Sequence, residues 1–584
     1  MKIMKTWMLF LCALSVVAQR STLHTPPSTL RSARRDACQS KNAPRYSPPM
    51  THEISLAGNF GEPRPNHFHG GLDLRTEGEE GKRVMSIGDG YVSRLTVGLF
   101  GFGNAVYVTH PEGYTSVYCH LQRFSPRLER MLKRWQYEHE QREADIRLSP
   151  SDYPVSQGQL VAFSGNTGHS FGPHLHLEIH DTRTWDMLDP LEFLGAYVND
   201  SVPPEIHGIK AYPQEGRGVY NEQEHTAWGQ VGFAVYADDY MQNSHNHYGI
   251  RLTQLLVDGR EVFRADVNGI PCSMNRMVNS WGDYDFFFHH SRWWLKMYIE
   301  PGNVLPILKA DEQRGIINFA EERDYHLEVI LTDYFGNQTR KAFVVRGEKS
   351  LSTLNAPRSP LHAPLGPQGR LPEQEPSTLH PQRSNFINSP GMQLVVPYGF
   401  VGVDTPLDMS VDNSDGLSPV YSFYEHSCPL FYDAELSIAA RSQVDDPSKL
   451  FIGHDYGQLV SLGGTYKDGW VTTRVRDLGG RFLLLYDDEP PVIEPRSTDA
   501  SSLLRFDIHD ELSGIKSYKG YVDGQFVLFK AITQSLTVNK TGTTPIACRL
   551  SNTPIKKKGV VRHLKLIVTD NCDNQQTYET SITY

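Results

Sequence analysis

The chain has 584 residues, 39% of them hydrophobic, and a formal net charge of −10 from 57 basic and 67 acidic side chains. A prior of about 150 residues per domain predicts roughly four globular domains. The acidic balance and the lack of a long basic run argue against a nucleic-acid partner. Seven cysteines are too few to hold so long a chain together as a disulfide scaffold.

The amino terminus has the pattern of a secretory signal peptide. Lys2 and Lys5 precede an apolar run that ends at Val17, and small or apolar residues follow at a plausible cleavage point. We therefore expect a signal peptide over residues 1–18 and a linker over 19–51. The apolar run is short for a membrane span, and no later segment approaches about 20 continuous apolar residues. We expect export to the periplasm, the cell envelope or the outside, with no stable membrane span.

Two histidine motifs in residues 52–200 supply three candidate metal ligands. His69 and Asp73 lie in the run His-Phe-His-Gly-Gly-Leu-Asp, and His174-Leu175-His176 follows much later. Imidazole nitrogens and a carboxylate oxygen suit Zn²⁺, and three protein ligands leave its fourth position open for water. Water held there becomes a hydroxide source near neutral pH. The motifs therefore favour a hydrolase.

The second motif has the period of a β-strand. Leu175, Leu177 and Ile179 share one face, and the opposite face carries His174, His176, Glu178 and His180. Gly70 and Gly71 are poor helix residues, so the first motif is also expected on extended or looped backbone.

A third block, Val117-Tyr118-Cys119-His120-Leu121, follows an alternating apolar run at residues 105–108 and is expected on a neighbouring strand. His120 is a candidate acid or base. Cys119 is interpreted as a small buried residue, with a thiolate ligand as the less favoured alternative.

Together with the flanking runs Gly58-Asn59-Phe60-Gly61-Glu62 and Gly165-Asn166-Thr167-Gly168-His169-Ser170-Phe171-Gly172-Pro173, these blocks closely resemble the lysostaphin/LytM-like family of zinc endopeptidases, in that family's order. The resemblance spans residues 52–195. It implies an antiparallel β-sheet domain with a groove, peptidoglycan peptides as substrate, and zinc as cofactor. Its implied metal ligands are His69, Asp73 and His176, and its implied catalytic residues are His120 and His174.

The sequence leaves two features of this domain open. It does not decide whether His120 or His174 is the base and which mainly stabilises the oxyanion. His67 precedes His69 by two positions and is a weaker alternative ligand. The stretch 122–155 is longer than the family's usual connection, and residues 127–147 after Pro126 are expected to form a helix. That helix either walls the groove or packs on the domain's side.

Two later modules repeat a common pattern. Residues 201–348 and 489–584 each begin near a Pro-Pro pair, contain Val-Asp-Gly between apolar residues, and end on Thr-Asp followed by Asn. Val-Asp-Gly predicts a hairpin turn, and Thr-Asp predicts a turn between alternating strands. Both modules resemble immunoglobulin-like β-sandwiches. This resemblance gives no function, because such domains bind glycans, dock partners or act as spacers.

The segment between the modules is expected to hold a linker and a further β-rich domain. Residues 351–390 contain eight prolines and little periodicity, so a Pro-rich linker is predicted over 349–390. A β-rich domain of unassigned function is predicted over 391–488. Cys548 and Cys572 are candidates for one disulfide. The expected fold class is therefore mainly β, with one helical insertion.

Three functions follow as hypotheses. The leading one is an exported zinc endopeptidase that cleaves peptidoglycan cross-links or stem peptides, because all five motif residues are present. The second is a non-catalytic envelope regulator that binds a partner hydrolase. The third is an exported protease acting on proteins, or an adhesin in which the β modules dominate and meet an envelope partner.

Overall fold

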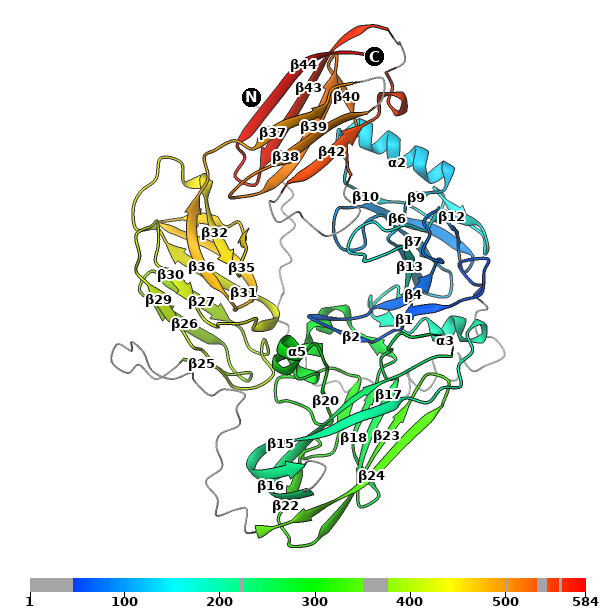
Figure 1. Cartoon of the computed structure of the whole chain (residues 1–584), viewed down its shortest axis with the longest axis vertical. Helices are drawn as coiled ribbons and strands as arrows, with labels where there is room; N and C mark the ends of the chain where they lie inside the picture. Colours follow the sequence, from blue (N-terminus) through cyan, green and yellow to red (C-terminus); the bar gives the residue numbers. More distant parts are fainter. Residues whose placement is uncertain are drawn as a thin grey trace, which may run out of the picture. The chain divides into compact units, whose positions relative to one another are not determined.

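The computed structural model describes residues 46–220, 225–242, 244–349, 377–499, 503–532, 543–555 and 559–584 (Figure 1). Strands dominate these residues, which confirms the prediction of a mainly β chain. No helix among them is long and apolar enough to cross a bilayer. The predicted signal peptide over 1–18 and most of the predicted linkers lie outside the described residues.

The first domain is built on an antiparallel sheet whose central strands carry the motif residues. In spatial order the strands are β1 (Leu56–Gly58), β4 (Gly71–Arg75), β13 (His174–Asp181), β8 (Tyr114–Cys119), β7 (Ala105–Thr109), β6 (Gly90–Val97) and β10 (Ala144–Arg147). A smaller sheet adds β5 (Arg83–Met85), β12 (Leu160–Phe163) and β9 (Arg123–Phe124). Short strands β2 (Pro63–Arg64) and β3 (His67–Phe68) form a hairpin before β4, and β11 (Pro154–Val155) pairs with β6.

The alternation predicted for residues 173–180 is observed in β13. Leu175, Leu177 and Ile179 are fully buried in the core of the first domain. The histidine-bearing face is turned the other way, and the register pairs His176 with Asp73 on β4 and with Cys119 on β8. The sheet therefore brings the three sequence blocks side by side.

The predicted helix over 127–147 is too long. Helix α2 spans Pro126–His139, with Pro126 in its first turn as expected, and ends at Glu140, which has a left-handed conformation. The residues after it return to the sheet as β10, which pairs with β6. Ala144 is buried there, and Asp145 forms an ion pair with Arg94. The polar residues 140–143 interrupt the apolar spacing, so the sheet pairing of β10 prevails over the local helix propensity.

The predicted linker over 19–51 also ends too late. Tyr46 and Met50 are 3% and 4% exposed and pack in the first domain's core. Burying two large apolar side chains favours folding of this segment onto the domain.

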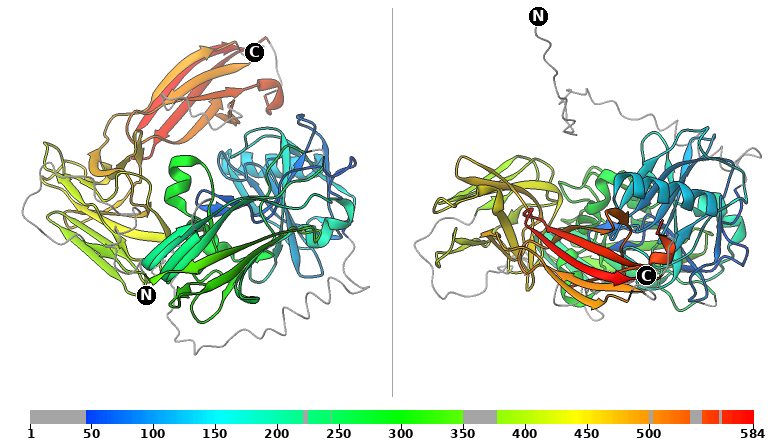
Figure 2. Two further views of the ribbon diagram at one scale, coloured as in Figure 1. Left: turned by 60° about the horizontal axis from the view of Figure 1, so that its bottom comes forward. Right: turned by 90° about the horizontal axis from the view of Figure 1, so that it is seen from above.

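The second domain begins with a long hairpin. Strands β15 (Glu205–Tyr220) and β16 (His225–Asp238) run side by side (Figures 1 and 2). They belong to one sheet with β17 (Leu252–Val257), β18 (Arg260–Asp266), β20 (Leu295–Lys296), β21 (Leu308–Ala310), β22 (Ile317–Phe319), β23 (Asp324–Thr332) and β24 (Gln338–Gly347). Short helices α4 (Val278–Trp281) and α5 (Tyr284–His290) lie between β19 (Gly269–Ile270) and β20.

The first and second domains share sheet pairing and core. β14 (Met187–Leu188) pairs both with β13 and with β19 of the second domain. Phe60 and Phe68 of the first domain are buried in the same cluster as Trp281 of the second. The turn that leads to His69 is thereby held by residues more than 180 positions away.

The third domain has two five-stranded sheets over one core. One contains β26 (Asn385–Ser389), β27 (Met392–Val396), β31 (Pro429–Ala439), β34 (Thr465–Lys467) and β35 (Trp470–Asp477). The other contains β29 (Ser410–Asp412), β30 (Val420–Ser422), β32 (Leu450–Asp455), β33 (Leu459–Ser461) and β36 (Arg481–Tyr486). The predicted linker to residue 390 is therefore too long, because β25 (Thr378–Leu379) and β26 fall inside it. Ile387 is buried between exposed neighbours, which is the strand alternation that the prolines obscured.

The fourth domain has two four-stranded sheets. One is formed by β37 (Val492–Ser497), β38 (Leu504–His509), β42 (Thr544–Cys548) and β41 (Lys530–Ala531). The other is formed by β40 (Gln525–Val527), β39 (Ile515–Val522), β43 (Val561–Asp570) and β44 (Gln575–Thr583). Cys548 and Cys572 are separate thiols, so the candidate disulfide is not formed.

Both predicted Val-Asp-Gly turns are hairpin turns in the structure. Asp258 and Gly259 connect β17 to β18, and Asp523 and Gly524 connect β39 to β40. All four residues have positive φ, the backbone that tight two-residue hairpins require.

Candidate metal centre

Three side chains from the predicted motifs converge at one point. Nε2 of His69 lies 3.0 Å from Nδ1 of His176. Oδ1 of Asp73 lies 3.0 Å from the first nitrogen and 2.8 Å from the second. His69 follows the β2–β3 hairpin, Asp73 is on β4, and His176 is on the adjacent strand β13. All three side chains are buried.

The far side of each imidazole is fixed by a hydrogen-bond acceptor. Nδ1 of His69 donates to the backbone carbonyl of Asn59 at 2.5 Å, and Nε2 of His176 donates to Oε1 of Glu178 at 2.9 Å. In a neutral ring the other nitrogen is then unprotonated. Both lone pairs therefore point at the carboxylate oxygen of Asp73.

Three lone pairs at such short separations need a positive charge among them. Two imidazole nitrogens and one carboxylate oxygen form a donor set that suits zinc, and a metal-bound histidine ordinarily has its other nitrogen held by a carboxylate or carbonyl. Glu178 and the Asn59 carbonyl provide this second layer. The residues present therefore fit a zinc ion.

The charges around the centre favour a cation. Although burial by itself raises the pKa of Asp73, its close contacts with His69, His174 and His176 hold that pKa far below its usual range. Burial lowers the pKa of His69 to about 4 against the opposing effect of Asp73. Burial also lowers the pKa of His176, but Asp73 and Glu178 outweigh it and raise the value to about 9. In the absence of a metal, His176 is thus the ring that takes a proton.

A guanidinium holds the second oxygen of Asp73. Nη2 of Arg64 donates to Oδ2 of Asp73 at 3.0 Å and to Oε2 of Glu62 at 3.2 Å. Because Arg64 binds Oδ2 of Asp73, the other oxygen, Oδ1, faces the nitrogens of His69 and His176. Gly58 lies against the same three side chains, and an added Cβ there would be 2.9 Å from Oδ2 of Asp73.

The two predicted catalytic histidines stand beside the convergence point. The rings of His120 and His174 have centroids 4.9 Å apart, and those of His120 and His176 are 5.7 Å apart. Nε2 of His174 is 3.4 Å from Oδ1 of Asp73. Nδ1 of His120 bonds to the carbonyl of Thr167 at 2.8 Å, and Nδ1 of His174 bonds to that of Gly172 at 2.8 Å. Each neutral ring therefore presents Nε2 as a proton acceptor.

His120 is held in an unusual local environment. It directly follows β8 rather than lying on it, and its φ of 57° is left-handed, a conformation that costs a non-glycine residue on the order of 1–3 kcal/mol and that clusters at functional sites. Burial, with the neighbouring His176 and His174, lowers its pKa to about 3. The ring is therefore a neutral acceptor at physiological pH.

Exposed aromatic side chains lie in the two loops that adjoin the histidines. Phe171 is 94% exposed and Phe100 is 66% exposed, in two loops that contact each other through Gly103 and Gly168. Phe102, in the first of these loops, stacks at 6.0 Å from the ring of His176. Large exposed apolar side chains beside a buried polar centre are typical of a ligand-binding face.

The two other candidate residues, His67 and Cys119, are not part of the convergence point. His67 is exposed, and its Nδ1 contacts the carbonyl of Pro65 instead of the centre. Cys119 is fully buried beside Ala105, Tyr107 and Val117, and burial raises its pKa, so the small-buried-residue interpretation agrees with its environment. The structure thus brings together His69, Asp73, His176, His120 and His174, and leaves His67 outside.

The residues that orient these five are not identified by the sequence motifs. Glu178 accepts from Nε2 of His176 and, at 2.6 Å, from Nε2 of His180. Its signal was present, since it shares the polar face of β13 with the histidines. Asn59 orients His69 through its backbone carbonyl, and Arg64 reaches Asp73 from the β2–β3 hairpin. Neither contact can be recognised from residue spacing in the sequence.

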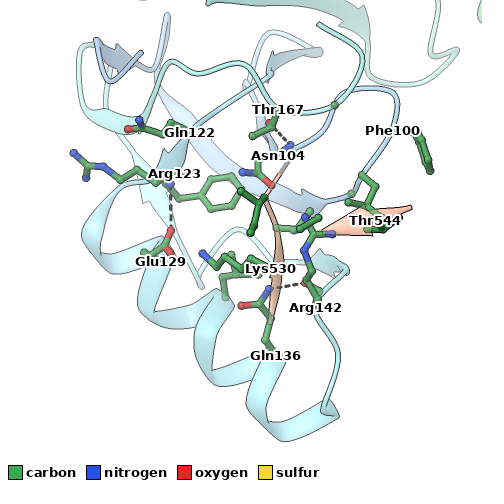
Figure 3. Close-up of a pocket in the computed structure, with 18 of the residues that line it drawn as sticks. Phe100, Asn104, Gln122, Arg123, Glu129, Gln136, Arg142, Thr167, Lys530 and Thr544 are labelled. Carbon is green, nitrogen blue, oxygen red and sulfur yellow. Dashed lines mark hydrogen bonds between the residues drawn. The ribbon is translucent and has the colours of Figure 1, made fainter. Parts of the chain in front are cut away.

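Helix α2 packs on the side of the domain. Leu128 and Leu132 are buried in the core. The helix also borders a cavity of about 290 Å³ that Glu129, Gln136, Arg142, Thr167, Lys530 and Thr544 line with others (Figure 3). Thr167, whose carbonyl holds His120, thus lies between this cavity and the histidines.

A β-sheet domain with a buried His-His-Asp centre and two adjacent histidines has the groups that a metal-dependent hydrolase needs. Comparison with known proteins agrees: residues 67–137, which include His69, Asp73 and His120, match Peptidase family M23. The region around this match accordingly resembles the lysostaphin/LytM-like family. Residues 376–487 match the Zu5-like domain.

Individual relatives match a limited part of the chain. An uncharacterized metalloprotease of Haemophilus influenzae is 28% identical over 142 residues, which is 24% of this chain and 23% of the relative. A peptidoglycan DD-endopeptidase of Vibrio cholerae is 33% identical over 98 residues, which is 17% of each. The catalytic domain of lysostaphin from Staphylococcus simulans is 21% identical, with a TM-score of 0.19, and the similarity covers 24% of this chain and 92% of that domain. The chain thus spans less than a quarter of the length of the Haemophilus influenzae and Vibrio cholerae relatives.

Proposed function

We propose that this chain is an exported, zinc-dependent endopeptidase that hydrolyses peptide bonds in peptidoglycan cross-links or stem peptides. The observation that carries the proposal is the convergence of His69, Asp73 and His176 within 3.0 Å of one another. The peptidoglycan DD-endopeptidase among the relatives supports the substrate class.

His69, Asp73 and His176 would hold the metal. When bound, zinc supplies a Lewis acid for the scissile carbonyl and lowers the pKa of a coordinated water toward about 7. Glu178 and the carbonyl of Asn59 keep the two ligand rings in the required tautomer. Arg64 keeps the carboxylate of Asp73 turned so that Oδ1 faces the histidines.

His120 and His174 would carry the proton. Both rings have Nδ1 bonded to backbone carbonyls, so Nε2 of either can accept a proton from water and return it to the leaving amine. A ring that takes the proton becomes a cation, which stabilises an oxyanion nearby. Phe100, Phe102 and Phe171 would flank the bound peptide.

Digestion of purified peptidoglycan by the zinc-loaded protein tests the proposal, with new amino groups as the readout. We expect release by the wild type, abolition by a zinc-selective chelator, and restoration when zinc is returned. His69→Ala and His120→Ala should each lower the rate by at least about 100-fold. His67→Ala is the matched control, because this exposed histidine is two positions from His69 and outside the centre.

Two outcomes would contradict the proposal. Intact muropeptides from the zinc-loaded wild type, combined with stimulation of a partner hydrolase, would assign the chain to the regulators. Cleavage of protein substrates alone would assign it to general proteases.

A further inference from the structure

Three aspartates meet where the chain passes from the first domain into the second. Asp200 lies in the connection, Asp239 directly follows β16, and Asp333 directly follows β23. One carboxylate oxygen of each lies within 4.8 Å of the others. Asp239 and Asp333 are 5% and 3% exposed, whereas Asp200 is only partly buried and leaves the cluster open to solvent.

Two oxygens of this cluster are buried without a hydrogen bond. Oδ1 of Asp239 and Oδ2 of Asp200 have no partner among the residues that the structure describes. A buried polar atom left in this state costs about 1–3 kcal/mol, and more if it is charged. Asp333 differs, because its two oxygens accept from the backbone and side-chain amides of Asn337 at 2.8 and 2.7 Å. The turn fixes Asp333, while Asp239 and Asp200 offer unpaired oxygens.

The raised pKa values of the cluster also indicate that it lacks a neighbouring positive charge. Burial and the charges of Asp333 and Asp200 raise the pKa of Asp239 to about 8, against a lowering by the backbone NH of Tyr240. Burial also raises the pKa of Asp200. Three carboxylates in a low-dielectric site repel one another unless a positive charge joins them.

The fourth domain repeats the arrangement with its oxygens more fully bonded. Asp487, Asp510 and Asp570 form a second trio, and Asp487 precedes a Pro-Pro pair by three positions, as Asp200 does. There Oδ2 of Asp487 accepts from the NH of Ser513 at 3.1 Å, and Oδ1 of Asp510 accepts from that of Gly514 at 2.6 Å. Among the residues that the structure describes, buried carboxylate oxygens without a hydrogen bond therefore occur in the first trio and not in the second.

We propose that Asp200, Asp239 and Asp333 bind a calcium ion. The donors are all oxygens, which selects a hard cation and disfavours zinc. Calcium accepts several carboxylates in irregular geometry, together with backbone carbonyls and water. Magnesium demands a near-ideal octahedron and is usually held by one or two carboxylates. The partly exposed side at Asp200 admits the water molecules that complete the shell.

Calcium titration of the zinc-loaded full-length protein in calcium-free buffer tests the proposal. Isothermal calorimetry should show that Asp239→Asn binds one equivalent of calcium fewer than the wild type. Asp238→Asn is the matched control, because its carboxylate pairs with His207 and His247 outside the trio. This control should bind as many equivalents as the wild type.

Thermal unfolding separates a calcium site from a merely structural aspartate. The wild-type midpoint should rise with calcium and rise less with magnesium at equal ionic strength. Asp239→Asn should unfold in calcium-free buffer at or above the wild-type temperature, because it removes a buried carboxyl group that repels Asp200 and Asp333 when ionised. Its calcium-dependent rise should be smaller. Equal stoichiometry in wild type and Asp239→Asn, an equal response to magnesium, or a loss of stability in Asp239→Asn without calcium would each overturn the proposal.

Discussion

Nδ1 of the proposed zinc ligand His69 donates to the backbone carbonyl of Asn59, and the side chain of Asn59 is anchored in the second domain. Its Nδ2 donates to the carbonyl of Gly249 at 2.8 Å, and its Oδ1 accepts from the NH of Gly249 at 2.8 Å. The orientation of His69 therefore depends on a residue 180 positions further along the chain.

Replacing Asn59 by alanine should weaken zinc binding without removing a ligand. The substitution deletes both bonds to Gly249, so the carbonyl that orients His69 is less well fixed. Changes of this kind in the layer behind a metal ligand ordinarily reduce affinity by about 10–100-fold. Competition with a chromophoric chelator measures the effect. Asn388→Ala, an exposed asparagine on β26, is the control, and equal zinc affinities of the two variants would refute the coupling.

Glu178→Gln should reduce zinc affinity and also change the titration of His180. The carboxylate of Glu178 accepts from His176 and His180. Burial lowers the pKa of His180, but Cys272 and Glu178 outweigh it and raise the value to about 10. A neutral amide keeps the shape but removes the charge. We expect about 10-fold weaker zinc binding and a lower pKa of His180 by NMR. An unchanged His180 titration would show that Glu178 does not supply the charge.

Gly71→Ala should destabilise the first domain. A Cβ at Gly71 would lie 2.1 Å from the carbonyl oxygen of Leu177, so β4 and β13 would have to separate. Backbone displacement of this kind typically costs about 1–3 kcal/mol. The comparison is Gly98→Ala, whose added Cβ would have its nearest neighbour at 3.7 Å. Similar unfolding midpoints for both variants would contradict the steric argument.

The sequence predicts the convergence of the motif residues well, because a strand with period two has only one way to place its histidines together. His174 and His176 are on the same face of β13, and pairing with β4 and β8 follows from the antiparallel sheet. The orienting groups are less predictable. The carbonyl of Asn59 carries no side-chain signal, and its fixation depends on Gly249, a tertiary contact far away in sequence.

The boundaries of the elements are harder to predict from the sequence than their type, because tertiary contacts set them. Residues 144–147 have acceptable helix propensity, yet they pair with β6, and that pairing includes an Arg94–Asp145 ion pair. Tyr46 and Ile387 each contribute one buried side chain to a core, which local composition does not reveal. Tertiary packing therefore decides where each element ends.

Asp189→Asn should reduce the loss of stability that occurs as pH rises from about 4 to 7. Burial raises the pKa of Asp189 to about 7, although Arg251 and the NH of Leu191 lower it. The folded protein keeps this proton between about pH 4 and 7, whereas the unfolded chain loses it, so the carboxyl group lowers stability as pH rises through that window.

The asparagine removes that loss and keeps an oxygen for the NH of Leu191, which now bonds at 2.9 Å. The variant should therefore match the wild type near pH 4 and exceed it at pH 8, on the order of 1.4 kcal/mol for each unit of elevation in the folded-state pKa. Denaturant unfolding at the two pH values measures the difference. A constant difference across the range would contradict the raised pKa.

Calcium should slow the loss of zinc, if the aspartate trio binds it as proposed. Asp239 and Tyr248 exchange two backbone hydrogen bonds of 2.9 Å, and the hydroxyl of Tyr248 donates to the carbonyl of Leu56 on β1 at 2.9 Å. β1 leads directly to Asn59, which orients His69. An ion that fixes Asp239 therefore steadies the segment behind a zinc ligand, and coupling between sites typically amounts to about 1–3 kcal/mol. Zinc release to a zinc-selective chelator should be several-fold slower with calcium than without it in the wild type and in Asp238→Asn. Asp239→Asn should release zinc at the same rate with and without calcium. A calcium effect that persists in this variant would show that calcium acts through another site.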